Sequence, residues 1–212
     1  MKIFATQILG GILILFATMS FAIGLTINCT WLFSLNMHWL NLHQATGLSF
    51  GQMHEEYMKM VNYIQFPWIG KLKFNYFSSS AHGLQHFADV KSLVEFNNLI
   101  LLITVPIAVY LLVKLHKNGK LWFLINPIRV IVTVSLVVIS LMIVNFDQIF
   151  VWFHEIFFRN SYWIFYPNQD PVINMLPDTF FGECFGLFFA IFLAEISIIF
   201  WQAKRSLKKS LS

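Results

Sequence analysis

Four long apolar stretches alternate with more polar segments along the chain. The apolar stretches cover residues 8–33, 93–115, 121–144 and 180–201. A helix needs about 20 mostly apolar residues to cross the hydrocarbon core of a bilayer, so each stretch is long enough to span a membrane. The pattern therefore predicts an all-α polytopic membrane protein with four transmembrane helices. The second of these helices is expected to kink at Pro106.

The first apolar stretch also has features of a secretory signal. Lys2 precedes it, and Ser20-Phe21-Ala22 is an acceptable cleavage site. The apolar run, however, continues well beyond Ala22 to Trp31 and Phe33. We therefore interpret the stretch as a retained transmembrane helix.

Two longer segments connect the predicted transmembrane helices, residues 34–92 and residues 145–179. In the first segment, apolar side chains at helical spacing predict an amphipathic helix over Glu55–Phe66. Ser78-Ser79-Ser80 is typical of a helix start that leads into the second transmembrane helix. The second segment is dense in Phe, Trp and Tyr. We expect the two segments to pack on each other as a cap, within one membrane domain that comprises residues 1–212.

Composition and charge support a membrane location and indicate the orientation. Hydrophobic residues make up 58% of the chain and charged residues 11%, whereas a soluble domain has about 25% charged residues. The net charge of +4 comes from basic residues at the ends of the apolar stretches, so it does not indicate nucleic-acid binding. By the positive-inside rule these residues place both termini in the cytoplasm and both connecting segments outside. They are Lys2, Lys114, Lys117, Lys120, Lys204, Arg205, Lys208 and Lys209.

Six of the seven histidines fall in the two connecting segments, and the spacing of two of them is informative. On a helix, His82 and His86 lie one turn apart, and Asp89 follows on the same face. Three interpretations remain open. The group could bind a metal ion, His86 could be a general base oriented by a carboxylate, or the histidines could only form hydrogen bonds within the cap.

His154 lies in an aromatic environment beside Phe153, Phe157 and Phe158. One interpretation is an aromatic belt at the membrane surface. The other is a catalytic histidine with restricted access of water, where a hydrogen bond to developing charge has more effect. The sequence contains no nucleophile elbow and no Walker or dinucleotide glycine pattern. Cys29 and Cys184 do not have the spacing of a disulfide framework or a zinc ribbon.

Three motifs resemble those of a known family. They are H-F-x-D-V-K at His86–Lys91, F-H-x-I-F-F-R-N-x-Y-W at Phe153–Trp163 and D-P-V-I-N-M-L-P at Asp170–Pro177. In these motifs, and in length and order of transmembrane helices, nearly the whole chain resembles the lipoprotein intramolecular transacylases. These are integral membrane proteins with four transmembrane helices from Gram-positive bacteria.

The resemblance implies an acyltransferase at the outer face of the bacterial cell membrane. Its substrates would be diacylglyceryl lipoproteins in the membrane, and it would act as a monomer without a cofactor or metal. The acyl chain at the sn-2 position of the diacylglyceryl group would move to the α-amino group of the same cysteine, which gives a lyso-form lipoprotein. The implied catalytic residues are His86 and His154. Residues that could position the substrate or the histidines are Asp89, Asp147, Arg159, Asn160 and Trp163.

The reaction assigns a task to each histidine. We expect His86, oriented by Asp89, to act as general base, and His154 to stabilise the oxyanion and return the proton. The two roles could be exchanged, because the sequence does not fix distances. Lys91 is expected to contact lipid headgroups. Two alternatives remain: a zinc-dependent membrane hydrolase that uses His82, His86 and Asp89, and a non-catalytic membrane accessory or immunity protein.

Overall fold

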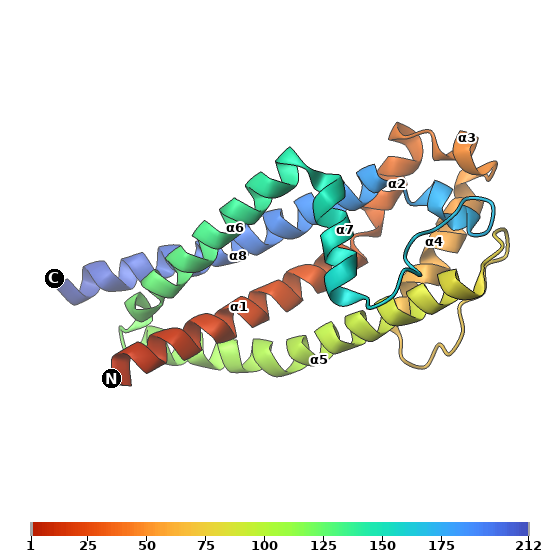
Figure 1. Cartoon of the computed structure of the whole chain (residues 1–212). Coiled ribbons are helices and arrows are strands. Elements are labelled where there is room, and N and C mark those ends of the chain that lie inside the picture. Colours follow the sequence, from red (N-terminus) through yellow and green to blue (C-terminus); the bar gives the residue numbers. More distant parts are fainter. Residues whose placement is uncertain (1, 212) are drawn as a thin grey trace. The chain divides into compact units, whose positions relative to one another are not determined.

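The computed structural model describes residues 2–211, and the side chains of residues 7–210. Lys2 is one of the basic residues on which the predicted orientation rests, and its side chain lies outside this range. Throughout the described residues the regular secondary structure is helical (Figure 1). The elements are α1 (Lys2–Asn28), α2 (Thr30–Trp39), α3 (Leu42–Thr46), α4 (Phe50–Gln65), α5 (Ala81–Lys117), η1 (Leu121–Leu124), α6 (Ile125–Val144), α7 (Phe146–Phe157), η2 (Pro171–Met175) and α8 (Asp178–Leu211).

Four helical segments among the described residues are long and apolar enough to cross a membrane. This confirms the prediction of an all-α membrane protein with four transmembrane helices. The segments are Gln7–Asn28, Ala81–Lys117, Leu121–Val144 and Asp178–Ser210.

The chain forms two compact units. The first, here called the bundle unit, is the described part of Met1–Leu25, Asn97–Val144 and Gly186–Ser212. The second, here called the histidine unit, consists of Thr26–Phe96 and Asn145–Phe185. Helices α1, α5 and α8 contribute residues to both units.

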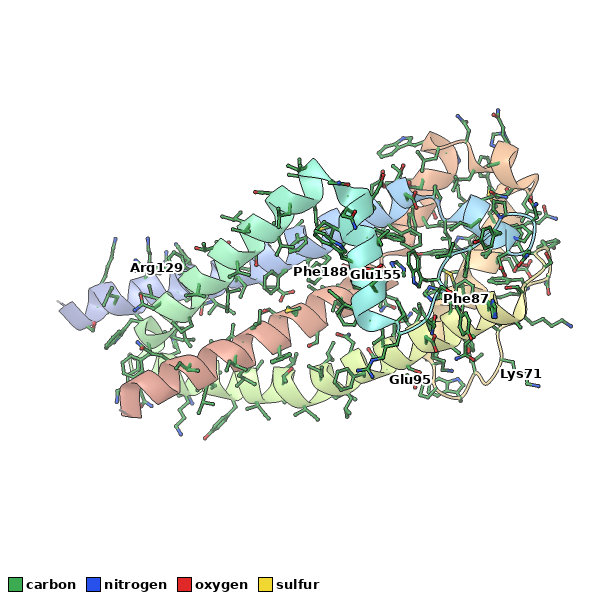
Figure 2. The ribbon with its side chains drawn as sticks, viewed as in Figure 1. Lys71, Phe87, Glu95, Arg129, Glu155 and Phe188 are labelled. Atoms are coloured by element: carbon green, nitrogen blue, oxygen red, sulfur yellow. The ribbon has the colours of Figure 1, made fainter. Side chains whose placement is uncertain are left out.

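Small and branched apolar side chains form the core of the bundle unit. An added Cβ at Gly11 of α1 would lie 2.6 Å from the Cβ of Pro127 in α6, so these two helices are in close contact there. Figure 2 shows Arg129 near the start of α6 and Phe188 on α8. The buried side chains of this core are Ile14, Ala17, Ala22, Ala108, Leu115, Leu121, Leu124, Ile125, Ile128, Ile131, Phe192, Ile196 and Ala203.

The first predicted transmembrane helix, residues 8–33, is interrupted in the structure. Helix α1 ends at Asn28, and α2 begins at Thr30. Between them Cys29 has φ −82° and ψ 59°, which is outside the helical region. The apolar run continues through this break, so hydropathy alone could not locate it.

Two helix starts in the histidine unit have specific caps. Helix α4 begins at Phe50, before the predicted start at Glu55, because Ser49 and Gln52 form a reciprocal capping box. At the start of α5, the Ser80 hydroxyl accepts a hydrogen bond of 2.9 Å from the Gly83 N–H. This agrees with the predicted helix start at the serine run.

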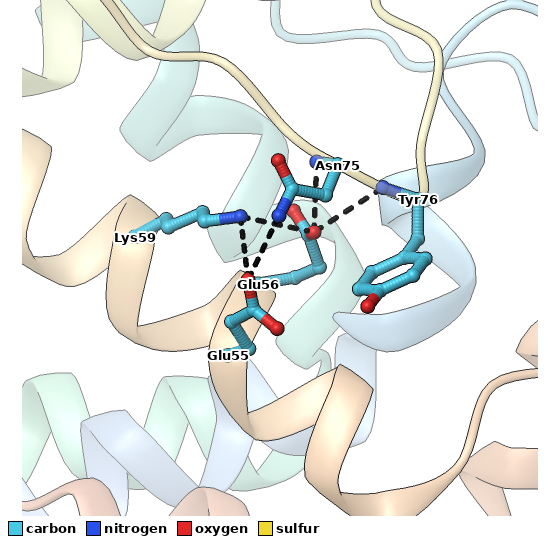
Figure 3. A network of polar contacts seen from close by, with 5 residues as sticks. All are labelled: Glu55, Glu56, Lys59, Asn75 and Tyr76. Atoms are coloured by element: carbon cyan, nitrogen blue, oxygen red, sulfur yellow. Dashed lines mark hydrogen bonds and ion pairs between the residues drawn. The ribbon is translucent and has the colours of Figure 1, made fainter.

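A buried carboxylate fixes the loop that connects α4 to α5. The side chain of Glu56 is fully buried, and its Oε1 accepts hydrogen bonds from the backbone N–H groups of Asn75 (2.8 Å) and Tyr76 (3.2 Å). Figure 3 shows this network, in which the Lys59 ammonium lies 2.9 Å from Glu55 Oε1 and 3.6 Å from Glu56 Oε1. The carboxylate satisfies backbone donors that have no helical partner.

Lys91 fixes the other end of the same loop and does not have the predicted role. We expected it to contact lipid headgroups. Its ammonium instead donates hydrogen bonds to the backbone carbonyls of Phe66 (3.0 Å) and Ile69 (2.6 Å). It also lies 4.7 Å from the centroid of the Tyr63 ring, in a cation–π contact. Lys91 is therefore a structural residue of the histidine unit.

Candidate active site

The histidines of the two main sequence motifs lie side by side in the histidine unit. His86 comes from the N-terminal part of α5 and His154 from the C-terminal part of α7. Their ring centroids are 5.8 Å apart, with an angle of 37° between the ring planes. Each residue is only 8% exposed. At this separation, both rings can contact one small reacting group.

A backbone hydrogen bond fixes the tautomer of His154. Its Nδ1 lies 2.7 Å from the carbonyl oxygen of Phe150, one helical turn earlier. Because a carbonyl oxygen can only accept, Nδ1 must carry the proton, and Nε2 of the neutral ring then has a free lone pair. Burial lowers the pKa of His154 below its usual value, and the bond to Phe150 partly opposes this effect. His154 is thus neutral at neutral pH and is a hydrogen-bond acceptor at Nε2.

His86 has a different environment, because its ring is packed against aromatic side chains and its Nδ1 forms no hydrogen bond within the described residues. Phe158 and Phe165 contact its ring edge-on, with centroids at 4.8 Å and 5.5 Å. Its Nδ1 is buried and has no hydrogen-bond partner within the described residues. A positive charge on the ring would be unfavourable in these buried, aromatic surroundings. His86 therefore offers a neutral imidazole with an unused ring nitrogen.

Asp89 does not orient His86 by a direct hydrogen bond. Its Oδ1 accepts from Gln85 Nε2 (2.8 Å), and its Oδ2 accepts from Asn160 Nδ2 (3.0 Å). The Asn160 Oδ1 in turn accepts from the backbone N–H of Tyr162 (3.0 Å). Asp89 thus connects α5, which carries His86, to the loop that follows α7, the helix that carries His154.

A second carboxylate connects the same two segments. Asp170 is almost fully buried, and its two oxygens accept hydrogen bonds of 2.8 Å from the backbone N–H and the hydroxyl of Ser80. An added Cβ at Gly83 would overlap this carboxylate, so a larger residue there would displace Asp170 from Ser80. Asp170 holds the first turn of α5, the helix that carries His86.

The loop between these two connections covers the histidines. The ring of Trp163 lies over His154, with centroids 4.7 Å apart and planes inclined by 31°. Tyr162 stacks on His82, with centroids at 4.3 Å and an angle of 16°. The loop therefore shields one face of the site from water.

The histidine pair lines a cavity of about 470 Å³ with mostly apolar walls. Its size is in the usual range for a small-molecule site. The residues that line it are Thr26, Ile27, Tyr57, Met60, Val61, Ile64, His86, Phe87, Val90, Phe150, His154, Trp163, Ile164, Phe165, Ile173, Leu176, Asp178, Phe180, Phe181 and Cys184.

The structure separates the predicted positioning residues into two groups. Trp163 lines the cavity, and Asp89 and Asn160 bond to each other behind the histidines. Asp147 and Arg159 are exposed and are not among the lining residues. Their involvement in substrate binding stays a prediction.

The side chains of the zinc alternative are not gathered as ligands. His82 stacks on Tyr162, and Asp89 accepts hydrogen bonds from two amides. Within the described residues no three His, Cys, Asp or Glu side chains form a group that could hold a metal ion. The geometry thus gives this alternative no support.

Several residues of the site were not identified from the sequence. The Phe150 carbonyl could have been found, because it lies one helical turn before His154. Asp178 follows Pro177 at the start of α8, which is a recognisable position for an acidic residue. Asp170 and Gly83 meet only in the folded chain, and no local signal predicts this contact.

The four apolar helices and the buried histidine pair are features of a membrane-integral enzyme. The model of the family "Lipoprotein intramolecular transacylase Lit" matches residues 8–181. The chain therefore belongs to this family, whose members are acyltransferases, and the resemblance seen in the motifs is confirmed.

Solved structures of one relative share the fold. The membrane-integral lipoprotein intramolecular transacylase Lit from Bacillus cereus is 23% identical, covers 99% of this chain and 97% of its own, and gives a TM-score of 0.89. Two histidine variants of that protein give 0.84 and 0.85, also at 23% identity and 99% coverage of this chain, with 93% and 95% of their own chains covered. No match was found among curated proteins.

Proposed function

We propose that this acyltransferase moves the sn-2 acyl chain of a diacylglyceryl lipoprotein to the α-amino group of the lipid-modified cysteine. The product is a lyso-form lipoprotein with one amide-linked and one ester-linked chain. The observation that carries the proposal is the buried pair of imidazoles, 5.8 Å apart, on the wall of one apolar cavity. The family membership of the chain supports the reaction class.

His154 is the general base in this proposal, and this exchanges the two roles first expected from the sequence. Its Nε2 has the free lone pair, because Nδ1–H is bonded to the Phe150 carbonyl. The same bond stabilises the imidazolium that forms when Nε2 takes the proton of the attacking amine. The amine nitrogen then forms a bond to the ester carbonyl carbon. General base catalysis of this kind contributes about 10²- to 10⁴-fold in rate.

His86 stabilises the oxyanion that this attack creates. A neutral imidazole has one N–H, and here it lies in aromatic surroundings where a hydrogen bond to negative charge is strong. When the intermediate collapses, the bond between the acyl carbon and the sn-2 oxygen breaks. The glyceryl oxygen then takes the proton from His154 Nε2. No covalent enzyme intermediate is needed, and each histidine ends in its starting state.

Confinement in the cavity supplies a further part of the rate. The nucleophile and the ester belong to one molecule, so the transition state closes a medium ring through the cysteine and two glyceryl carbons. Such a ring loses conformational entropy on closure. A rigid aromatic wall, such as Trp163 and Phe165 form here, selects the closed conformation before the reaction and thereby lowers the barrier.

The distribution of basic residues supports a site at the outer face of the bacterial cell membrane. Lys114, Lys117 and Lys120 lie at the end of α5 or directly after it, and more basic residues follow near the end of α8. With these on the cytoplasmic side, both termini are cytoplasmic and residues 34–92 and 145–179 form an outer cap. Both histidines come from one chain, so a monomer is sufficient.

The product of the purified protein tests the proposal. With a synthetic diacylglyceryl lipopeptide, we expect an isomer of unchanged mass in which fragmentation mass spectrometry finds one acyl group on the α-nitrogen. His86→Ala should leave substrate binding intact and slow the conversion by about 10²- to 10³-fold, as the loss of an oxyanion donor does elsewhere. A folded wild-type protein that leaves both acyl groups ester-linked would refute the proposal.

A further inference from the structure

One carboxylate in the cavity wall has no task in the reaction described so far. Asp178 begins α8, directly after Pro177; it is exposed, and it is one of the residues that line the cavity of the histidine pair. The other lining side chains are apolar or carry no formal charge, if both imidazoles are neutral. Asp178 is therefore the negative charge of this wall.

This carboxylate also differs from the other acidic residues of the histidine unit. Most of them have partners within the described chain: Glu55 and Glu56 with Lys59, Asp89 with Asn160, Glu95 with Lys91, Asp170 with Ser80, and Glu183 with Asn36. For Asp178 the described residues supply neither a hydrogen bond from another side chain nor an ion pair. The same is true of Asp147 and Glu155, but neither of these lines the cavity. Among the residues that the structure describes, only Asp178 combines a carboxylate without a side-chain partner and a position in the cavity lining.

The reaction brings a cation to this wall. A free α-amino group has a pKa of about 7.7–8.0, so at neutral pH most of the substrate carries an ammonium. Its transfer from water to a mostly apolar cavity is unfavourable unless an opposite charge is present. Before the amine can attack, the ammonium releases one proton to water, and during acyl transfer a second proton passes through His154 to the glyceryl oxygen. The product is an uncharged amide, which forms no ion pair with the carboxylate.

We propose that Asp178 is the binding site for the α-ammonium of the substrate cysteine. This inference rests on the proposed function and adds a specificity residue to it. The carboxylate selects lipoproteins with a free amino terminus over those that are already N-acylated. It also weakens the binding of the product, because the charge that held the substrate is gone.

The test uses a lipopeptide that binds without reacting. In a dialkylglyceryl cysteine peptide, ether bonds replace both esters, so no acyl chain can move. Its free-amine form and its N-acetyl form are titrated against the full-length protein in nanodiscs at low ionic strength. We expect the wild type to bind the free-amine form about fivefold to tenfold tighter than the N-acetyl form. This ratio lies between the effect of an exposed ion pair and the effect of a partly desolvated hydrogen bond to a charged group.

Asp178→Asn should remove this preference and leave the affinity for the N-acetyl form unchanged. Glu155→Gln is the matched control, because it removes one negative charge of the same unit that does not line the cavity. It should retain the full preference. A folded Asp178→Asn protein that still prefers the free amine would overturn the proposal, since a carboxylate that only stabilised the start of α8 would not distinguish amine from amide.

Two further measurements keep the test decisive if Asp178→Asn does not fold. Asp178→Glu keeps the charge and should keep the preference, and added salt should reduce the preference of the wild type for the free amine. A preference that does not change with salt counts against the carboxylate. Failure of the proposed function would look different, because the wild type would then not convert the ester-linked substrate at all.

Discussion

The bundle unit and the histidine unit satisfy their polar groups in different ways. In the bundle unit, hydroxyls mostly bond to their own helix: Thr18 donates to the carbonyl of Ile14 (2.7 Å) and Ser135 to that of Ile131 (2.8 Å). In the histidine unit, the buried carboxylates of Glu56 and Asp170 accept bonds from segments far along the chain. The first arrangement leaves tertiary packing mostly to apolar contacts, with a buried bond from the Asn97 amide to the Ser20 carbonyl (3.2 Å) between α5 and α1. The second uses charge to fix loops.

This difference follows from the surroundings of each unit. A transmembrane helix satisfies its backbone internally, so neighbouring helices need only fit closely. The histidine unit contains irregular segments, whose backbone N–H groups need acceptors when they are buried. The segments that carry the histidine pair are therefore joined by buried or partly buried carboxylates, Asp89 and Asp170, in addition to the aromatic rings packed on the two imidazoles.

The largest expected effect is on activity and belongs to the histidine unit alone. His154→Ala should lower the rate of acyl transfer by about 10²- to 10⁴-fold, because the general base is lost. His38→Ala is the matched control. His38 also bonds through Nδ1 to a carbonyl one turn earlier, that of Ser34 (3.0 Å), but it is exposed and does not line the cavity. Equal losses in the two variants would contradict the assigned role of His154, and single-turnover assays would measure both.

The next effect is on stability and tests the use of buried charge. Glu56→Ala should lower the free energy of unfolding by about 3 kcal/mol, because two buried backbone N–H groups lose their acceptor. The adjacent residue supplies the control, since Glu55 is half exposed, and its contacts with Lys59 and with the Asn75 side-chain amide are open to solvent and contribute little to stability. Thermal unfolding in detergent compares the two variants. If they were equally stable, the carboxylate would not be the acceptor that holds the loop.

The third prediction tests close packing in the bundle unit. Gly11→Ala should destabilise the protein by about 1–3 kcal/mol, because the new methyl group would overlap Pro127. Gly51→Ala in α4 is the contrasting change. No atom lies within 4 Å of its added Cβ, so better helix propensity should stabilise the protein by up to about 1 kcal/mol. Opposite signs in a thermal scan are expected, and a stabilising Gly11→Ala would show that the helices are not in contact there.

The smallest effect is a dependence of stability on pH. Burial lowers the pKa of His154, so below its usual pKa of 6.5 the unfolded chain binds a proton that the folded protein does not. Stability should therefore fall as the pH drops from 6.5 towards the lowered pKa of the folded state, and this contribution should level off below it. His154→Gln removes this part of the decline, which melting curves over the same pH range would detect. A melting temperature that rises on acidification through this window would be inconsistent with a lowered pKa.

The transmembrane helices could be predicted because hydropathy reports a property of each stretch by itself. The start of α4 could also have been found, since Ser49 and Gln52 have the spacing of a capping box. The break at Cys29 could not, because neither a proline nor a glycine marks it and the apolar run continues on both sides. Local signals therefore account for the elements but not for every boundary.

The site could be predicted only in part, because its supporting contacts join distant segments. The two histidines were identifiable from their motifs, but their separation and the tautomer of His154 were not. Lys91 was assigned to lipid headgroups because a basic residue near a membrane often has that role. Its actual partners are the carbonyls of Phe66 and Ile69, which carry no sequence signal.

The contact between Gly83 and Asp170 has a consequence for how this sequence can diverge. An alanine at position 83 would force the carboxylate at position 170 to move, so a larger residue at the glycine is easier to accommodate once that aspartate has been lost. If the larger residue appeared first, its side chain would overlap the Asp170 carboxylate, and either this carboxylate or the first turn of α5 would have to move. A homologue with a larger residue at position 83 is therefore expected to lack the aspartate at position 170 or to hold it in another place, whereas a homologue that keeps the glycine can have either residue there.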